Sequence, residues 1–208
     1  MPARSKPRYK YRYDGAEMVR RMQAIFTLCN ATVDDITEQT TIRYFDIVRK
    51  PRVVFGNCIM RLYDFAGFCA MFGISADFVV GRTDVMQQID RTCIGSCLAL
   101  GKPFNKRGFK GMVLHRGACV KERFGLTDVM TAEGMGTPMW NYKRWLECGM
   151  ITSTFIYAFC EAFDISYDYM LGFTEDMHAH KRQNVSGITA DRLYAIVQSK
   201  EQAVSVNG

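Results

Sequence analysis

Apolar residues recur at helical spacing along most of the chain, separated by short polar breaks. Residues 15–28 place Met18, Met22 and Ile25 on one stripe and turn Arg20, Arg21 and Gln23 away from it, which is the pattern of an amphipathic helix. The same spacing predicts further helices over residues 32–39, 41–48, 56–71, 84–99, 109–122, 127–134, 138–147, 151–163 and 189–202. The pattern therefore predicts an all-α fold.

One stretch of this pattern occurs twice in the chain of 208 residues. Residues 68–86 read FCAMFGISADFVVGRTDVM, and residues 159–177 read FCEAFDISYDYMLGFTEDM. At an offset of 91, nine of the nineteen positions are identical: Phe68/Phe159, Cys69/Cys160, Phe72/Phe163, Ile74/Ile165, Ser75/Ser166, Asp77/Asp168, Gly81/Gly172, Thr83/Thr174 and Met86/Met177. A repeat of this quality predicts a duplicated structural unit.

Each copy predicts an apolar helix, an Ile-Ser break, a short helix with a capping serine and a first-turn aspartate, and a glycine stop. Gly101, Pro103 and Gly108 break the helical pattern between the copies. The chain is therefore expected to consist of a basic N-terminal arm (1–13), a first unit with a linker helix (14–99), a basic linker (100–108), a second unit (109–180) and a C-terminal tail with one helix (181–208).

The second unit carries a small residue, Ala132, then Gly136 four positions later, Tyr142 at a core position and Trp145 at the next one. The first unit repeats the apolar frame with Ile36, Ile42 and Ile47, but has Thr37 and Thr41 where the small residue and glycine stand. With the repeated segments ending in Gly81 and Gly172, this pattern resembles the lambda-repressor-like, or Cro-repressor type, helix-turn-helix domain.

The resemblance covers residues 15–85 and 109–176. It implies two tandem five-helix helix-turn-helix domains, an extra C-terminal helix, and a sequence-specific, double-stranded DNA-binding transcription regulator such as a repressor. Two departures stand out. The family often begins its second helix with a DNA-contacting glutamine, where this chain has Val33 and Asp128, and an aspartate repels phosphate. The first unit also has four extra residues around Arg49, Lys50, Pro51 and Arg52. This basic loop could compensate through phosphate contacts, or it could be an insertion without a role in binding.

The third helix of each unit is expected to present its outer face to a major groove. In the second unit the outward candidates are Met139, Trp140, Asn141, Lys143 and Arg144. In the first unit they are Arg43, Tyr44, Asp46 and Arg49, with Lys50 and Arg52 in the loop that follows. Asparagine can pair with adenine, and lysine and arginine can reach guanine or phosphate. An exposed helix face is polar in any protein, however, and Trp140 or Tyr44 could equally complete a core or an interface.

Residues 1–13 form a basic arm without an acidic residue, in which basic side chains alternate with Tyr9, Tyr11 and Tyr13. Its Arg8, Lys10 and Arg12 are candidates to contact a phosphate backbone or a minor groove. A solubilising tail would have the same composition. The arm is therefore expected to be extended, with either role open.

A second function class remains open beside DNA binding. One or both units could have lost DNA binding and could instead act as a protein-interaction or dimerisation module. Trp140, Trp145, Tyr44 and Phe45 would then form an apolar docking surface. The C-terminal helix could pack on the second unit or join two chains as a homodimer.

The composition of the chain limits which functions and partners we expect. The chain has 27 Lys and Arg against 21 Asp and Glu, a net charge of +6 that permits a polyanionic partner. Its eight cysteines show no zinc-finger spacing, and no catalytic or nucleotide-binding motif occurs. We expect no enzyme activity, metal, cofactor or small-molecule ligand pocket. No apolar signal region and no run of eighteen apolar residues occur, so the expected location is cytoplasmic, without a membrane span.

Overall fold

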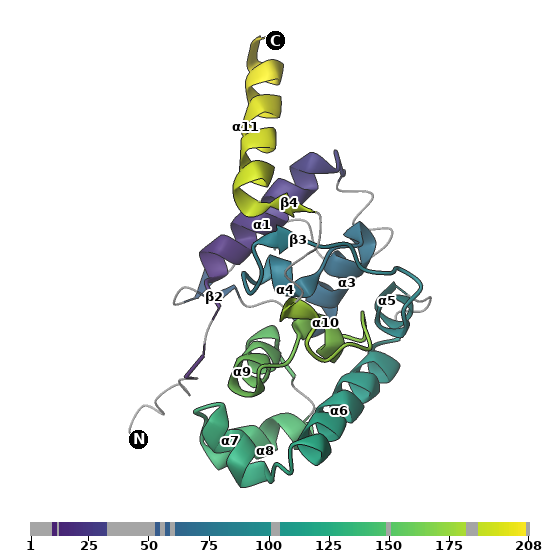
Figure 1. Ribbon diagram of the computed structural model, residues 1–208, viewed down its shortest axis with the longest axis vertical. Helices are drawn as coiled ribbons and strands as arrows, with labels where there is room; N and C mark the ends of the chain where they lie inside the picture. The colour runs from purple at the N-terminus through teal and green to yellow at the C-terminus, as the bar shows by residue number, and fades with distance from the viewer. Residues whose placement is uncertain are drawn as a thin grey trace.

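A computed structural model describes residues 10–11, 13–32, 53–54, 57–58, 61–100, 105–148, 151–181 and 187–206. This part of the chain is mostly helical, in agreement with the predicted all-α fold class (Figure 1). The helices are α1 (Gly15–Leu28), α3 (Leu62–Phe72), α4 (Ala76–Val79), α5 (Ile94–Leu100), α6 (Lys106–Arg123), α7 (Asp128–Gly134), α8 (Met139–Cys148), α9 (Ser153–Phe163), α10 (Tyr167–Met170), α11 (Ala190–Val206) and the 3₁₀ turn η2 (Ala179–Lys181). None of the described helices is long and apolar enough to cross a membrane.

Four two-residue strands complete the described structure. β1 (Val53–Val54) pairs antiparallel with β2 (Asn57–Cys58), and β3 (Val85–Met86) pairs antiparallel with β4 (Ile188–Thr189). The helices predicted over 32–39 and 41–48 lie outside the described residues, apart from residue 32.

The predicted helix over 84–99 is wrong in its first half. Residues 85–86 form β3 because β4, about a hundred positions later in the chain, supplies their hydrogen-bonding partners. The backbone N–H of Ile89 also donates to the carbonyl oxygen of Gly73 at 2.9 Å, which ties the segment to the end of α3. Only the second half becomes helical, as α5. The predicted helix over 56–71 likewise begins later, at Leu62, and the predicted linker is shorter because α6 already begins at Lys106.

The C-terminal helix packs on the first unit. Its predicted cap, Thr189, accepts from the backbone N–H of Arg192 at 3.3 Å. Leu193 is fully buried, and the hydroxyl of Tyr194 donates to Glu17 of α1 at 2.6 Å. Farther along, Lys200 donates to the carbonyl oxygen of Leu28 at 3.1 Å. The helix therefore covers α1 rather than the second unit, and a homodimer formed through it remains a prediction.

An arginine from the first helix of each unit is buried in the core. The prediction that Arg21 faces away from the core is wrong, because it is 7% exposed and donates to the carbonyl oxygens of Phe78 and Thr83, both at 2.8 Å. Arg116 of α6 donates in the same way to Tyr169 at 2.8 Å and Thr174 at 2.7 Å. These are the equivalent carbonyls of the two copies. Each arginine satisfies acceptors that would be costly to bury unpaired.

The two copies are joined through their shared aspartates. Asp168 accepts hydrogen bonds from the hydroxyl of Ser75 at 2.5 Å and from the backbone N–H of Ala76 at 2.6 Å. In return, Asp77 accepts from the hydroxyl of Ser166 at 2.6 Å and from the backbone N–H of Tyr167 at 2.9 Å. Each aspartate therefore caps the short helix of the other copy, because its side-chain oxygens accept from backbone N–H groups of the first helical turn. We call Ser75, Asp77, Ser166 and Asp168, together with the backbone N–H groups of Ala76 and Tyr167, the aspartate clamp.

In a two-fold interface the contacts are reciprocal: if residue i of one copy contacts residue j of the other, residue j of the first contacts residue i of the second. The clamp relates α4 and α10 in this way within one chain. It fixes the first unit against the second at their most similar segments. The repeated Asp is thus an inter-unit contact, in addition to its place in a first helical turn.

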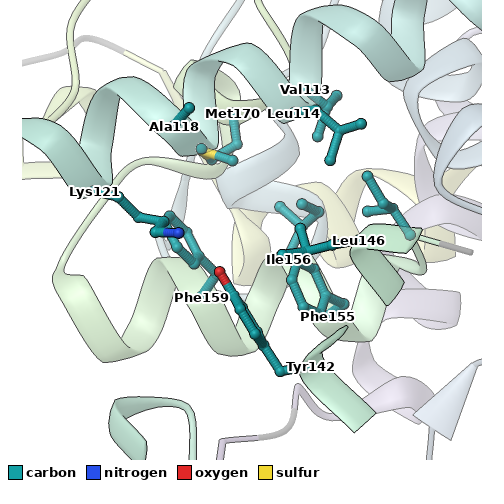
Figure 2. Close-up of a pocket in the computed structure, with 12 residues that line it drawn as sticks. Val113, Leu114, Ala118, Lys121, Tyr142, Leu146, Phe155, Ile156, Phe159 and Met170 are labelled. Atoms are coloured by element: carbon teal, nitrogen blue, oxygen red, sulfur yellow. The ribbon is translucent and has the colours of Figure 1, made fainter. Parts of the chain in front are cut away.

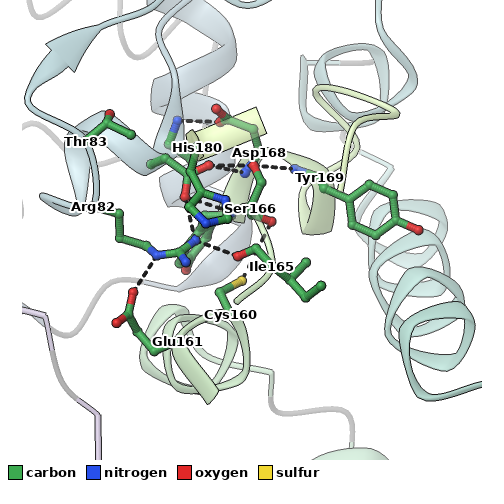
Figure 3. A network of polar contacts seen from close by, with 12 residues as sticks. Arg82, Thr83, Cys160, Glu161, Ile165, Ser166, Asp168, Tyr169 and His180 are labelled. Carbon is green, nitrogen blue, oxygen red and sulfur yellow. Dashed lines mark hydrogen bonds and ion pairs between the residues drawn. The ribbon is translucent and has the colours of Figure 1, made fainter. Parts of the chain in front are cut away.

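The charges of the clamp are not symmetric. Arg82 pairs with Asp77 at 2.7 Å. It also pairs with Glu161 at 2.5 Å and donates to the carbonyl oxygen of Ile165 at 2.5 Å (Figure 3). The position equivalent to Arg82 in the second copy is Phe173. Among the described residues Asp168 forms no ion pair. Burial, with the nearby charge of Asp77, raises the pKa of Asp168 to about 8.

This asymmetry predicts a pH-dependent stability. The carboxyl of Asp168 loses its proton near pH 8 in the folded chain and near pH 4 in the unfolded chain. Between these values the folded state holds the extra proton, so stability falls as the pH rises from about 4 to about 8. The urea midpoint at pH 5.5 should exceed that at pH 8, and Asp168→Asn should reduce this difference. An equal pH dependence in both proteins would contradict the assignment.

Candidate nucleic-acid interface

Helices α7 and α8 are joined by a tight turn that local sequence explains. The hydroxyl of Thr127 accepts from the backbone N–H of Met130 at 3.2 Å and caps α7, as predicted. After α7, Gly136 adopts a left-handed conformation with φ 63°, which a residue with a side chain rarely adopts. The hydroxyl of Thr137 then accepts from the side-chain amide of Asn141 at 3.0 Å, within the first turn of α8. Gly136 thus ends α7, and the bond between Thr137 and Asn141 joins the turn to α8.

The inner face of α8 packs on α9. Tyr142 and Trp145 are buried, and the ring centroid of Trp145 lies 4.5 Å from that of Phe155 in an edge-on contact. Ala132 of α7 is also buried. The predicted core positions are therefore confirmed. Trp145 cannot belong to an exposed docking surface, and that part of the interaction hypothesis is wrong.

The outer face of α8 carries Trp140, Lys143 and Arg144, all exposed, with Trp140 at 56%. Two of the five outward candidates lie elsewhere. Met139 is half-buried and packs against the core. The prediction that Asn141 faces outward is wrong, because it is 4% exposed and its amide bonds to Thr137.

The negative charge of Asp128, which we expect to repel phosphate, is balanced by a neighbouring cation. Its carboxylate pairs with Lys121 of α6 and accepts from the hydroxyl of Tyr142 at 3.3 Å. The hydrogen bond from Lys121 lowers the pKa of Asp128, so the group is ionised at neutral pH but stands beside a cation. The local charge of the pair is therefore close to zero. Repulsion of a phosphate at the start of α7 is correspondingly weaker.

The described end of the N-terminal arm lies against the second unit. The backbone N–H of Lys10 donates to the carbonyl oxygen of Met135 at 3.3 Å, and its Cβ is close to Gly136. Tyr13 is buried, its hydroxyl lies 3.1 Å from that of Ser153, and its ring meets Tyr157 edge-on at 5.4 Å. The exposed Lys10 side chain is therefore held beside the turn between α7 and α8. We call Lys10, Trp140, Lys143 and Arg144 the α8 face.

The remaining predicted site residues cannot be placed. Those of the arm and of the first unit lie outside the described residues: Arg8, Arg12, Arg43, Tyr44, Phe45, Asp46, Arg49, Lys50 and Arg52. Nothing in the spacing of the sequence indicates that Lys10 lies beside the second unit. The spacing does indicate that Asn141 is buried, because Asn141 stands four residues before the core Trp145 and so shares its helix face.

No arrangement for metal chemistry occurs in the part of the chain that the structure describes, where no group of three or more His, Cys, Asp or Glu side chains could hold an ion. Cys93 is hydrogen-bonded to Ser96, and His178 and His180 both contact Asp164. The α8 face is thus the described surface on which the predicted DNA-binding residues meet.

Comparison with protein-family models, with curated proteins and with solved structures finds no match for the chain.

Proposed function

We propose that the protein is a sequence-specific, double-stranded DNA-binding transcription regulator that uses two helix-turn-helix units in one chain. The observation that carries the proposal is the α8 face. A helix held from behind by Tyr142 and Trp145 presents Lys143 and Arg144 outward, and Lys10 from another part of the chain lies at the turn before it. A major groove is wide enough to admit such a helix.

The side chains of this face divide between two kinds of contact. Lys10, Lys143 and Arg144 are cations that can neutralise phosphates, and arginine or lysine can also bind guanine in the groove. Trp140 stands in the first turn of α8, where an apolar side chain can contact a thymine methyl group. Asn141 takes no part, because its side chain is buried and its amide already donates to the hydroxyl of Thr137.

The aspartate clamp supports the use of both units together. Homodimeric regulators place two identical reading helices by a two-fold axis, so their sites are palindromic. Here a single chain relates its copies through reciprocal contacts of Asp77 and Asp168. Because the two copies differ in sequence at their third helices, the two half-sites need not be the same.

Exposed apolar residues favour a second candidate function, a protein-interaction module. Trp140 is 56% exposed, and Val129 and Met130 of α7 are 52% and 48% exposed. Aromatic residues and methionine are enriched in protein interfaces. In this alternative, Trp140→Ala would abolish binding to a protein partner, and Lys143 and Arg144 would contribute little.

Replacement of both cations tests the proposal. In the variant Lys143→Ala/Arg144→Ala the affinity for a duplex should fall more than tenfold, and the slope of log K against log salt should decrease by about 2, since each lost phosphate contact removes about one unit. The affinity is measured by fluorescence anisotropy on a selected duplex, at salt concentrations between about 50 and 200 mM.

A matched control is Arg91→Ala/Arg192→Ala. It removes the same charge from exposed positions of the first unit and the C-terminal helix. This control should keep most of the affinity. Equal losses in the two double variants would mean that net charge alone drives binding, and the α8 face would then have no special role.

A further inference from the structure

The second unit contains a partly open apolar cavity of about 200 Å³ (Figure 2). The cavity lies between α6, α8 and α9, and Met170 of α10 also lines it, close to Ala118. Its walls include Val113, Leu114, Phe155, Ile156, Phe159 and Met170. No feature of the sequence indicates this cavity.

One end of the cavity is polar. Lys121 and Tyr142 line it, and their polar atoms lie at the same end in Figure 2. Ala118, also at the lining, is exposed, and the side chain of Lys121 is 25% exposed. A small molecule can therefore enter the cavity from this end.

The volume of the cavity fits a small ligand. A dry apolar cavity of about 150 Å³, lined by aliphatic and aromatic residues, holds benzene in another protein. A cavity of about 200 Å³ thus accommodates one aromatic ring with a substituent. The rings of Phe155, Phe159 and Tyr142 in the wall can meet such a ring edge to face.

The charge at the opening selects a neutral ligand. Lys121 is already paired with Asp128, and the hydrogen bond to Asp128 raises the pKa of Lys121 despite the opposing effect of partial burial. An anionic ligand would have to displace Asp128 or stand beside it. The ammonium group has three donors, however, so a neutral oxygen can accept a further hydrogen bond from it.

We infer that the second unit binds a neutral single-ring aromatic molecule with one oxygen substituent, a phenol-class ligand. The ring lies among Val113, Phe155 and Phe159, and the oxygen accepts a hydrogen bond from Lys121. The inference does not depend on DNA binding, because it concerns the interior of the unit rather than the α8 face. Its test needs no DNA.

Three probes of similar size separate the contributions: p-cresol, toluene and benzoate. Titration calorimetry with the full chain should give the order p-cresol, then toluene, then benzoate, with p-cresol at least fivefold tighter than toluene. Absence of saturable p-cresol binding at millimolar concentration would overturn the inference. Toluene as tight as p-cresol would overturn the polar contact, and benzoate tighter than p-cresol would overturn the neutral class.

Variants locate the site. A Cβ at Gly117 would lie 3.7 Å from the terminal methyl group of Met170, an ordinary contact, so Gly117→Ala fits while taking space at the cavity. A Cβ at Gly111 of the same helix meets nothing within 4 Å, which makes Gly111→Ala a control with the same gain in helix propensity. Gly117→Ala should weaken p-cresol binding at least threefold relative to Gly111→Ala. Equal affinities would place the ligand elsewhere.

The polar end has its own variant. Lys121→Met keeps the aliphatic stem but removes the donor. The affinity for p-cresol should fall to that for toluene, and the affinity for toluene should stay unchanged. An unchanged preference for p-cresol in this variant would contradict the assigned hydrogen bond.

Discussion

Replacing Asp77 with alanine is expected to lower the free energy of unfolding by about 3–5 kcal/mol, the range for breaking a buried charge pair by removing one partner. Asp77 is 1% exposed and accepts hydrogen bonds from Ser166 and from the backbone of Tyr167 and Asp168. Its loss leaves these donors unsatisfied and removes one of the two carboxylate partners of the buried Arg82. Urea unfolding followed by circular dichroism measures the effect.

Asp84→Ala provides the matched control. Asp84 lies in the same unit, and its side chain is 68% exposed although it stands 3.5 Å from Arg21. An exposed ion pair of this kind contributes at most about 1 kcal/mol. If Asp77→Ala were no more destabilising than Asp84→Ala, the aspartate clamp would not hold the two units together.

Gly95→Ala is expected to destabilise the fold by about 3 kcal/mol, at the upper end of the usual cost of overpacking. An added Cβ would overlap the carbonyl oxygen of Leu171 and would lie 2.8 Å from the carbonyl carbon of Gly172. The backbone of α5 approaches the end of α10 closely enough for Gly95 to donate to Gly172 at 3.0 Å. The added methyl group therefore has to separate the two units. Thermal and urea unfolding measure the loss.

Gly111→Ala is the control for helix propensity, since its added Cβ meets no other group within 4 Å. It should stabilise the protein by about 0.5–1 kcal/mol. The two glycine-to-alanine changes are expected to alter stability in opposite directions. The comparison therefore separates the effect of the close approach of α5 and α10 from the effect of helix propensity. A stabilising Gly95→Ala would contradict that packing.

Local features of the fold could be predicted from the sequence. Helix α1 spans Gly15–Leu28, the predicted range, because its amphipathic stripe and the capping Asp14 define both its face and its start. The caps Ser75, Ser166 and Thr127 also follow from residue type and position. These features depend on interactions within a few residues, which a single sequence contains.

Features that depend on distant partners could not be predicted. Residues 85–86 read as part of a helix, but the partner strand at 188–189 decides their conformation. The charge of Arg21 predicts a position on the solvent side, although two carbonyl oxygens of another segment make its burial favourable. The repeated Asp was recognised as a first-turn residue, but its principal partners are in the other copy.

The candidate site shows the same division. Trp140, Lys143 and Arg144 are exposed, as the helical periodicity of α8 predicted. The cavity beside α8 was missed because it arises where α6, α8 and α9 leave space between them, which residue volumes alone do not reveal. The position of Lys10 was missed for a similar reason, since it depends on the path of the arm from the first unit to the second.

The most direct test of the proposed function is selection of binding sites from a pool of random DNA duplexes with the full chain, followed by footprinting. The proposal predicts enrichment of a motif with two unequal half-sites, and loss of protection over one of them in Lys143→Ala/Arg144→Ala. A selection that enriches no motif would contradict sequence-specific binding by this protein.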